Sequence, residues 1–166
     1  MADLPSSNSE PPGSLDDKFC LGLHHLGYLT ADLPAAALHF QRTLGYRLES
    51  LVIEDTAQTA RVQFLRQPGS TSWLELVTPN GRHSKLTNAL RRGDGLHHVC
   101  YEVMDLELAC ARYRERGCMM VGAPTPAQAF SGGRIAWFMD DRRFLFELLE
   151  AEPGPLSLAS ILPPRR

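Results

Sequence analysis

The sequence predicts an α+β fold: two tandem βαβββ modules, related by pseudo-twofold symmetry, form a curved β-sheet cup with the helices outside. Three observations support this fold class. A histidine doublet occurs twice, at residues 24–25 and 97–98, so that the two copies lie 73 residues apart. Each doublet is followed by an Asp-Leu pair, an Ala-containing amphipathic stretch and a glycine. Each copy then closes on an apolar-Glu-apolar triplet, centred on Glu75 and Glu147.

The first copy contains the signals of one strand, one helix and three further strands. Leu23–Thr30 alternates between apolar and polar residues, which favours a strand. Asp32 is a typical N-cap, the helix is expected to run to about Leu44, and Gly45 stands where a C-cap belongs. Three strands are then expected at Tyr46–Ile53, Ala60–Leu65 and Ser72–Thr78.

The second copy repeats this order of elements. We expect a strand over Leu96–Val103 and a helix from about Leu106 to Arg116, which ends at Gly117. Three strands then follow near Cys118–Gly122, Gly133–Met139 and Phe144–Leu149. The polar stretch between the copies is compatible with a short helix in Ser84–Arg92.

The predicted organisation is a disordered N-terminal tail at 1–20, a first module at 21–79, a connector at 80–94, a second module at 95–152 and a C-terminal tail at 153–166. The N-terminal tail is rich in Ser, Pro and Gly and is not a secretory signal. No apolar run has the length of a membrane span, and a net charge of −2 gives no reason to expect nucleic acid or an anionic membrane as partner. The four cysteines lack CxxC spacing, which is typical of reduced thiols in a cytoplasmic protein.

Strand alternation predicts which histidine of each doublet faces the cleft. Four strands with a helix on one face leave the other face uncovered, and two such sheets can close around a shared cleft. In Leu96–Val103, His98 lies on the more polar face, while His97 shares a face with apolar residues. The same reasoning turns His25 and the small Gly27 toward the cleft. The remaining four histidines are interpreted as ordinary core or surface residues: His24, His39, His83 and His97.

One His and one Glu from each module are therefore expected to converge, namely His25, Glu75, His98 and Glu147. Two carboxylates in an apolar cleft repel each other and are costly to desolvate, and a divalent cation removes both problems. Two nitrogen and two oxygen donors suit one ion of Co, Zn, Ni, Mn or Fe, and the lack of thiolates argues against a structural zinc site. The alternative is a metal-free relic of duplication. Arg61 and Arg134 also recur in register, and their role stays open because strand-edge charges are common.

Several stretches resemble the vicinal oxygen chelate superfamily, which includes glyoxalase I, methylmalonyl-CoA epimerases, extradiol dioxygenases and fosfomycin- and bleomycin-resistance proteins. They are "HHLGYLTADLPAAALHF", "VQFL", "LELVTP", "GLHHVCYEV", "SGGRIAWF" and "LFELLE". Within the superfamily they look most like methylmalonyl-CoA epimerases. This resemblance implies metal ligands at His25, Glu75, His98 and Glu147, the same four residues that the repeat selects, and it implies a homodimer. Whether the two modules pair within one chain or across a dimer is left open.

The resemblance implies a divalent-metal-dependent isomerase or epimerase that enolises an acyl-CoA-type substrate, similar to methylmalonyl-CoA, by proton transfer at the α-carbon. In such enzymes the metal stabilises the enolate and a carboxylate moves the proton. Some epimerases carry a catalytic Glu on the strand where this chain has Val62, Gln63 and Phe64. Gln63 cannot serve as a base, so the expected catalytic groups are Glu147 and Glu75, with Gln63 left to orient substrate. The expected partner is a small acyl thioester.

Three other activities within the superfamily are alternatives. A glyoxalase I-type lactoylglutathione lyase shares a His-Glu-His-Glu set, but its glutathione-gripping Arg corresponds to Leu29 here. An Fe²⁺ dioxygenase uses two His and one carboxylate, and the fourth donor Glu75 counts against it. A ligand-sequestering resistance protein needs no metal. The connector's basic residues suit the phosphates of a CoA ester or simply a solvated surface: Arg82, Lys85, Arg91 and Arg92.

Overall fold

The computed structural model of the chain describes residues 20–151. The predicted tails therefore lie outside the described residues, apart from Cys20, which begins the first strand. The elements, in chain order, are β1 (Cys20–Leu29), α1 (Leu33–Leu44), β2 (Arg47–Leu48), β3 (Ile53–Asp55), β4 (Ala60–Arg66), β5 (Trp73–Pro79), α2 (Thr87–Leu90), β6 (Gly95–Val103), α3 (Leu106–Glu115), β7 (Met119–Met120), β8 (Thr125–Pro126), the 3₁₀ turn η1 (Gln128–Phe130), β9 (Arg134–Met139) and β10 (Leu145–Glu150).

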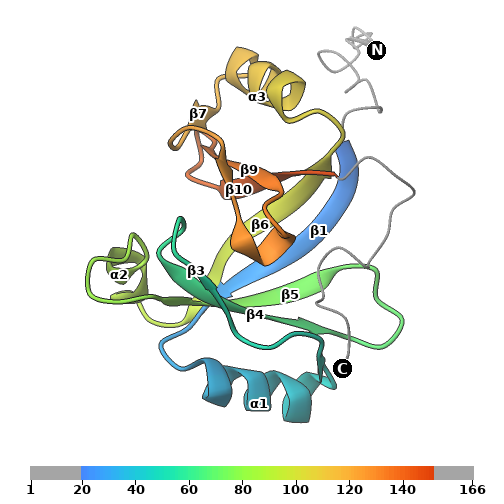
Figure 1. The fold of residues 1–166 in the computed structure, drawn as a ribbon, viewed down its shortest axis with the longest axis vertical. Helices are drawn as coiled ribbons and strands as arrows, with labels where there is room; N and C mark the ends of the chain where they lie inside the picture. The colour runs from blue at the N-terminus through green and yellow to red at the C-terminus, as the bar shows by residue number, and fades with distance from the viewer. Residues whose placement is uncertain (1–19, 152–166) are drawn as a thin grey trace, which may run out of the picture.

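The two modules share one curved sheet, as the repeat predicts. Its path is β2-β4-β5-β1-β6-β10-β9-β7, with β3 paired to β4 and β8 paired to β9. Within each half the first strand pairs in parallel with the last, β1 with β5 and β6 with β10. The halves join through the antiparallel pair β1 and β6. The modules therefore pair within one chain, and the two strands that carry the histidine doublets lie side by side at the centre of the sheet (Figure 1).

The two long helices, α1 and α3, cover the outer face of the sheet at opposite ends of the molecule, as Figure 1 shows. Leu33 and Ala37 of α1 pack in an apolar cluster with residues of β4 and β5, and Leu106 and Ala109 of α3 pack with residues of β9 and β10. Each helix begins at an aspartate whose carboxylate accepts a backbone N–H three residues on, from Ala35 at 3.0 Å and from Leu108 at 2.9 Å. The N-cap predicted at Asp32 is thereby confirmed, and Asp105 caps the second helix in the same way.

The strand expected at Tyr46–Ile53 is interrupted. Both of its ends, β2 and β3, pair with β4, but the chain between them leaves the ladder. The physical reason is Ser50, whose hydroxyl accepts the backbone N–H of Phe64 at 2.9 Å and donates to the carbonyl of Leu51. The Ser50 hydroxyl thus replaces a backbone carbonyl as the partner of the Phe64 N–H. The alternation of apolar and polar residues does not reveal this competition between side chain and backbone.

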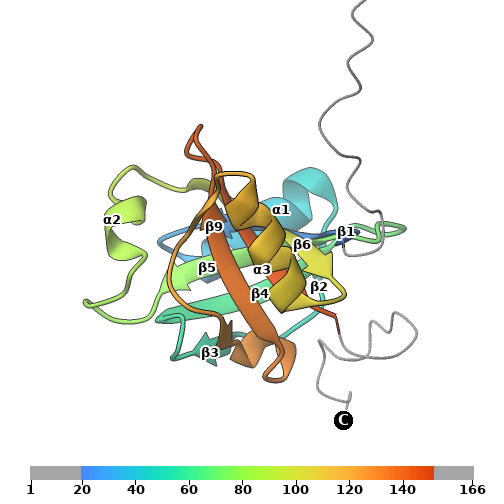
Figure 2. The same ribbon diagram turned by 90° about the horizontal axis from the view of Figure 1, so that it is seen from above.

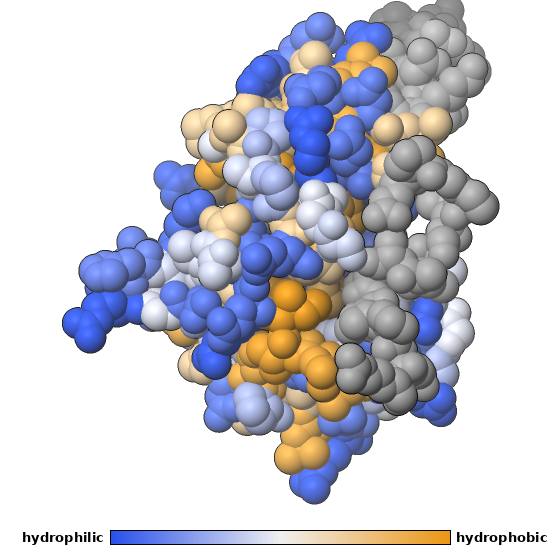
Figure 3. Space-filling view, in the orientation of Figure 1, coloured by the Kyte–Doolittle hydropathy of each residue, from blue (hydrophilic) through white to orange (hydrophobic). Residues whose placement is uncertain are grey.

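The inner face of the sheet carries its own core. Phe64, Trp73, Cys100 and Ile135 belong to one buried cluster, together with Phe130 of the turn η1. Figure 2, seen from above, shows α2 beside the strands and away from α1 and α3. The face in Figure 3 is largely hydrophilic at its ends, with apolar residues gathered near its middle above α1. In the described part of the chain, no helix has both the length and the apolar character needed to cross a bilayer.

Candidate metal centre

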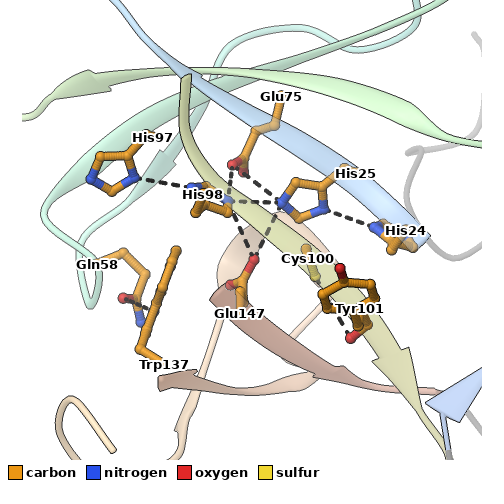
Figure 4. A network of polar contacts seen from close by, with 10 residues as sticks. All are labelled: His24, His25, Gln58, Glu75, His97, His98, Cys100, Tyr101, Trp137 and Glu147. Carbon is orange, nitrogen blue, oxygen red and sulfur yellow. Dashed lines mark hydrogen bonds and ion pairs between the residues drawn. The ribbon is translucent and has the colours of Figure 1, made fainter. Parts of the chain in front are cut away.

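Four side chains converge at the centre of the inner face, drawn in Figure 4. The Nε2 atoms of His25 and His98 lie 3.1 Å apart. Oε2 of Glu75 lies 3.5 Å from the first of these nitrogens and 3.4 Å from the second. Oε2 of Glu147 lies 3.2 Å and 3.6 Å from the same two atoms. All four residues are buried. The two histidines and the two glutamates that the repeat selects therefore meet at one point.

The sheet register brings them together. His25 and His98 lie on the central strands β1 and β6, while Glu75 and Glu147 come from the flanking strands β5 and β10. Gly27 stands directly across from His98 in the β1–β6 ladder. A Cβ at Gly27 would lie 2.5 Å from Nε2 of that ring and still closer to its Cε1 and Nδ1. The absence of a side chain at position 27 therefore provides the space that the His98 imidazole occupies.

The donor spacing fits a divalent metal ion. Metal–ligand bonds of about 2.0–2.2 Å to imidazole nitrogen and carboxylate oxygen place neighbouring donors roughly 3.0–3.6 Å apart in tetrahedral or octahedral geometry. The one nitrogen–nitrogen and four nitrogen–oxygen separations described above run from 3.1 to 3.6 Å. The set contains no thiolate among its four members, so it matches sites that keep positions open for substrate rather than closed structural zinc sites. The residues present therefore fit a metal ion.

The electrostatics show what holds these groups together without a cation. Burial alone raises the pKa of Glu75, but His25 and His98 outweigh it and lower the pKa below its ordinary value. Burial alone lowers the pKa of His25, but the sulfur of Cys100 and the carboxylate of Glu75 outweigh it and raise that pKa well above 6.5. Glu75 is thus ionised and His25 holds a proton. The metal-free centre therefore pairs the His25 imidazolium with the Glu75 carboxylate.

This charge pattern predicts how metal affinity depends on pH. A metal needs the lone pair on Nε2 of His25, which carries a proton below the raised pKa of that histidine. Affinity for Co²⁺ should therefore fall as the pH falls through this pKa, by about tenfold per pH unit for each proton displaced. Glu75, whose pKa is lowered, stays ionised over the same range and adds no slope. Competition with a chelator between about pH 6 and 9 measures the slope, and a flat profile would contradict the assignment.

The outer histidine of each doublet contacts its inner neighbour. The Nδ1 atoms of His24 and His25 lie 2.8 Å apart, and those of His97 and His98 lie 3.0 Å apart. Burial, followed by the neighbouring inner histidine, lowers the pKa of His24 to about 3 and that of His97 to about 4. Both members of each doublet therefore recur in the sequence and lie in contact in the structure.

The other residues singled out from the sequence lie away from the centre. Gln63 pairs with Leu76 across the β4–β5 ladder, and its amide donates to the carbonyl of Ser50 at 3.2 Å. It does not line the cavity described below, whereas its neighbour Val62 does. Arg61 is exposed on β4. Arg134 contacts Glu107 of α3 and lies 3.7 Å from Glu150 of β10, which ties the helix to the sheet. The Gln63 amide is therefore engaged by Ser50 and lies outside the cavity wall.

A cavity of about 280 Å³ opens onto the candidate metal centre. Glu75, Glu147, His97 and His98 contribute to its wall. The rest is largely apolar and includes Ala60, Val62, Val77, Leu86, Ala127, Phe130, Ile135 and Trp137. A second hollow of about 470 Å³ shares His97 and His98 with it and extends past Arg92 and Arg143. A substrate with an apolar acyl end and an anionic tail would match this shape.

Gln58 and Trp137, which the sequence analysis did not select, line the cavity and link the two modules. Gln58, in the turn between β3 and β4, donates to Oγ1 of Thr125 at 2.9 Å. Its carbonyl oxygen accepts from Nε1 of Trp137 at 3.2 Å. The Trp137 ring in turn stands edge-on to His98, with centroids 4.7 Å apart. No repeat or motif marks Gln58, because its partners lie in the other module.

Comparison with known proteins places these features in a family. The profile of the Glyoxalase/Bleomycin resistance protein/Dioxygenase superfamily matches residues 24–138. An ethylmalonyl-CoA/methylmalonyl-CoA epimerase of Cereibacter sphaeroides is 30% identical over 132 residues, which cover 78% of this chain and 96% of that protein. The crystal structure of methylmalonyl-CoA epimerase from Mycobacterium tuberculosis superposes with a TM-score of 0.74 at 29% identity, covering 84% of this chain and 94% of that one.

A more distant structure shares the fold. A variant of Streptomyces coelicolor methylmalonyl-CoA epimerase, solved with 2-nitronate-propionyl-CoA, gives a TM-score of 0.67 at 24% identity and covers 78% of this chain and 96% of that one. The tandem modules, the shared cup and these relatives agree with one another. The chain therefore belongs to the glyoxalase/bleomycin resistance protein/dioxygenase superfamily, as an enzyme related to the methylmalonyl-CoA epimerases.

Proposed function

We propose that this chain is a divalent-metal-dependent epimerase that moves the α-proton of an acyl-CoA thioester of the methylmalonyl-CoA type. One observation carries the proposal: two buried carboxylates from opposite halves of the cup flank one metal-compatible centre and both line its cavity. The relatives support the substrate class, since one is named an ethylmalonyl-CoA/methylmalonyl-CoA epimerase and another was solved with 2-nitronate-propionyl-CoA.

His25, Glu75, His98 and Glu147 would hold the metal. When bound, a divalent ion supplies Lewis acidity that stabilises the negative charge developing on the substrate oxygens as the α-proton leaves. The identity of the ion stays open among Co, Zn, Ni, Mn and Fe. The apolar wall of the cavity lowers the local dielectric and so strengthens every charge interaction at the centre.

The two glutamates are the groups that we assign to proton transfer. An epimerase takes the proton from one face of the carbon and returns it on the other, so it needs an acid–base group on each side. Ala60 and Val62, the residues of β4 that line the cavity, carry no titratable group. Asp55 lines it as well, but its carboxylate already accepts the backbone N–H groups of Gln58 and Gln128 at 2.9 and 2.8 Å. Of the carboxylates that line the cavity, Glu75 and Glu147 remain, one from each half.

The second hollow suits the CoA part of the substrate. Arg92 and Arg143 line it, and Lys85 lines the neighbouring cavity, so cationic side chains border the path away from the metal centre. Leu29, at the position of the glutathione-gripping Arg of glyoxalase I, contributes an apolar wall to this hollow. These features favour an acyl-CoA over a glutathione adduct. The homodimer and the cytoplasmic location stay predictions.

The reaction is tested by isotope exchange. In D₂O, the Co²⁺-loaded chain should interconvert the epimers of methylmalonyl-CoA and incorporate deuterium at the α-carbon, which mass spectrometry and NMR detect. Removal of the ion by a chelator should stop both processes, and its return should restore them. The hemithioacetal of methylglyoxal and glutathione, run in parallel, tests the lyase alternative. Turnover of that adduct without exchange in methylmalonyl-CoA would overturn the proposal in favour of the lyase.

A further inference from the structure

The two histidine doublets sit at matching irregularities of the central strand pair. In the β1–β6 ladder, Leu23 faces Tyr101 and His25 faces Cys100, so His24 is an extra residue on β1. Further along, Gly27 faces His98 and Tyr28 faces Leu96, so an extra residue, His97, lies on β6. Each irregularity is a β-bulge, a feature that redirects a side chain relative to strict alternation.

The bulges bring both members of a doublet into contact. Neighbours on a regular strand point to opposite faces, yet His24 and His25 meet through their Nδ1 atoms at 2.8 Å, and His97 and His98 meet in the same way at 3.0 Å. The Nε2 atoms of the two inner rings meanwhile point at each other and at the carboxylates (Figure 4). The four rings form a row with the metal centre in its middle.

An aromatic side chain holds each doublet in place. Phe130 stacks on His25 with ring centroids 5.8 Å apart and meets the edge of His24 at 5.6 Å. Trp137 stands edge-on to His98 at 4.7 Å and to His97 at 6.4 Å. Both members of a doublet are therefore packed against the same ring, which restricts the rotation of either imidazole.

Each pair of Nδ1 atoms shares one hydrogen, and metal binding determines which of the two nitrogens carries it. A histidine that gives its Nε2 lone pair to a metal carries its hydrogen on Nδ1 and must donate it. Nδ1 of His24 lies 2.8 Å from Nδ1 of His25, and Nδ1 of His97 lies 3.0 Å from Nδ1 of His98, so each outer ring can accept this hydrogen. We propose that His24 and His97 are positioning residues, which accept the Nδ1 proton of the adjacent ligand and thereby aim its Nε2 at the metal. This inference rests on the proposed metal centre but not on the proposed reaction.

His24 offers the cleaner test, because His97 lines the cavity whereas His24 does not. His24→Phe keeps a ring that can pack against Phe130 but removes the acceptor. His24→Asn keeps an acceptor, since the amide oxygen of Asn occupies nearly the place of Nδ1. His39→Phe, at an exposed histidine of α1, is the matched control. The measurements are the Kd for Co²⁺ from chelator competition, the visible absorption of bound Co²⁺, and thermal unfolding of each metal-free variant.

We expect His24→Phe to weaken Co²⁺ binding by about 10- to 100-fold and to alter the Co²⁺ spectrum, while its metal-free form unfolds cooperatively. His24→Asn should recover most of the affinity, and His39→Phe should bind like the original chain. His24→Phe with unchanged affinity, or His24→Asn as weak as His24→Phe, overturns the positioning role and leaves the metal centre intact. An original chain that binds no Co²⁺ overturns the metal centre and this inference together.

Discussion

Replacing either glutamate of the centre with glutamine is expected to stop epimerisation while leaving α-proton exchange of one epimer. If Glu75 and Glu147 serve opposite faces of the carbon, each variant retains one working base. That base can remove and return the α-proton of the one epimer whose α-proton points toward it, which gives exchange without inversion. We expect epimerisation to fall by about 10²- to 10⁴-fold in each variant. The two variants should also exchange opposite epimers.

The measurement is deuterium incorporation into each separate epimer of methylmalonyl-CoA, together with the metal content of each protein. Glutamine keeps an oxygen donor, so saturating Co²⁺ should still load both variants, and loss of metal is thereby separated from loss of the base. Glu102→Gln is the matched control, since Glu102 lies on the central strand β6, next to β10, but lines neither of the two hollows around the centre. Identical epimer preferences in Glu75→Gln and Glu147→Gln would contradict the two-face assignment.

Gly27→Ala is expected to remove metal binding. The new methyl group would overlap the imidazole of His98, because a Cβ at this position lies 2.5 Å from Nε2 and closer to two other ring atoms. The ring cannot simply retreat, since Trp137 stands against it with centroids 4.7 Å apart. Overpacking of this kind costs about 1–3 kcal/mol of unfolding free energy. The displaced Nε2 would no longer share a centre with His25, so Co²⁺ affinity and epimerisation should both be lost.

Gly95→Ala provides the control for that substitution. Gly95 lies on β6 in the same ladder, opposite Leu29, and a Cβ there meets no atom within 4 Å. Gly95→Ala should therefore retain Co²⁺ binding, measured by the same chelator competition, and thermal unfolding should report the cost in stability for both variants. Normal Co²⁺ affinity in Gly27→Ala would show that His98 does not occupy the space across from Gly27.

Much of the candidate metal centre could be predicted from the sequence. The recurrence of His25 as His98, and of Glu75 as Glu147, selected the four residues that meet in the structure. Alternation was sufficient to predict that the inner histidines face the cleft, because the residues that follow each of them alternate between the two faces of the sheet in the usual way. The helix boundaries were equally accessible, since a capping aspartate acts on a backbone N–H only three residues away.

The outer histidines could not be placed in this way. A single extra residue in one strand reverses the face of the next side chain, and the bulge is defined only by the register with the partner strand. His24 and His97 were therefore assigned to ordinary positions, although each contacts a proposed ligand. Gln58 was missed for a related reason, because its bonds to Thr125 and Trp137 join modules that the sequence separates.

The duplicated βαβββ modules could be predicted from the amino-acid sequence alone, as could the N-cap Asp32 and the quartet of two histidines and two glutamates. These depend on repetition, on alternation and on contacts between residues close together in the chain. The three-dimensional structure was needed to show that both modules pair within one chain, that Gln63 lies away from the cavity and that each inner histidine has an imidazole partner. Those features depend on how β1 and β6 are aligned against each other and on which side chains meet across the cup, and neither is encoded in the local pattern of either module alone.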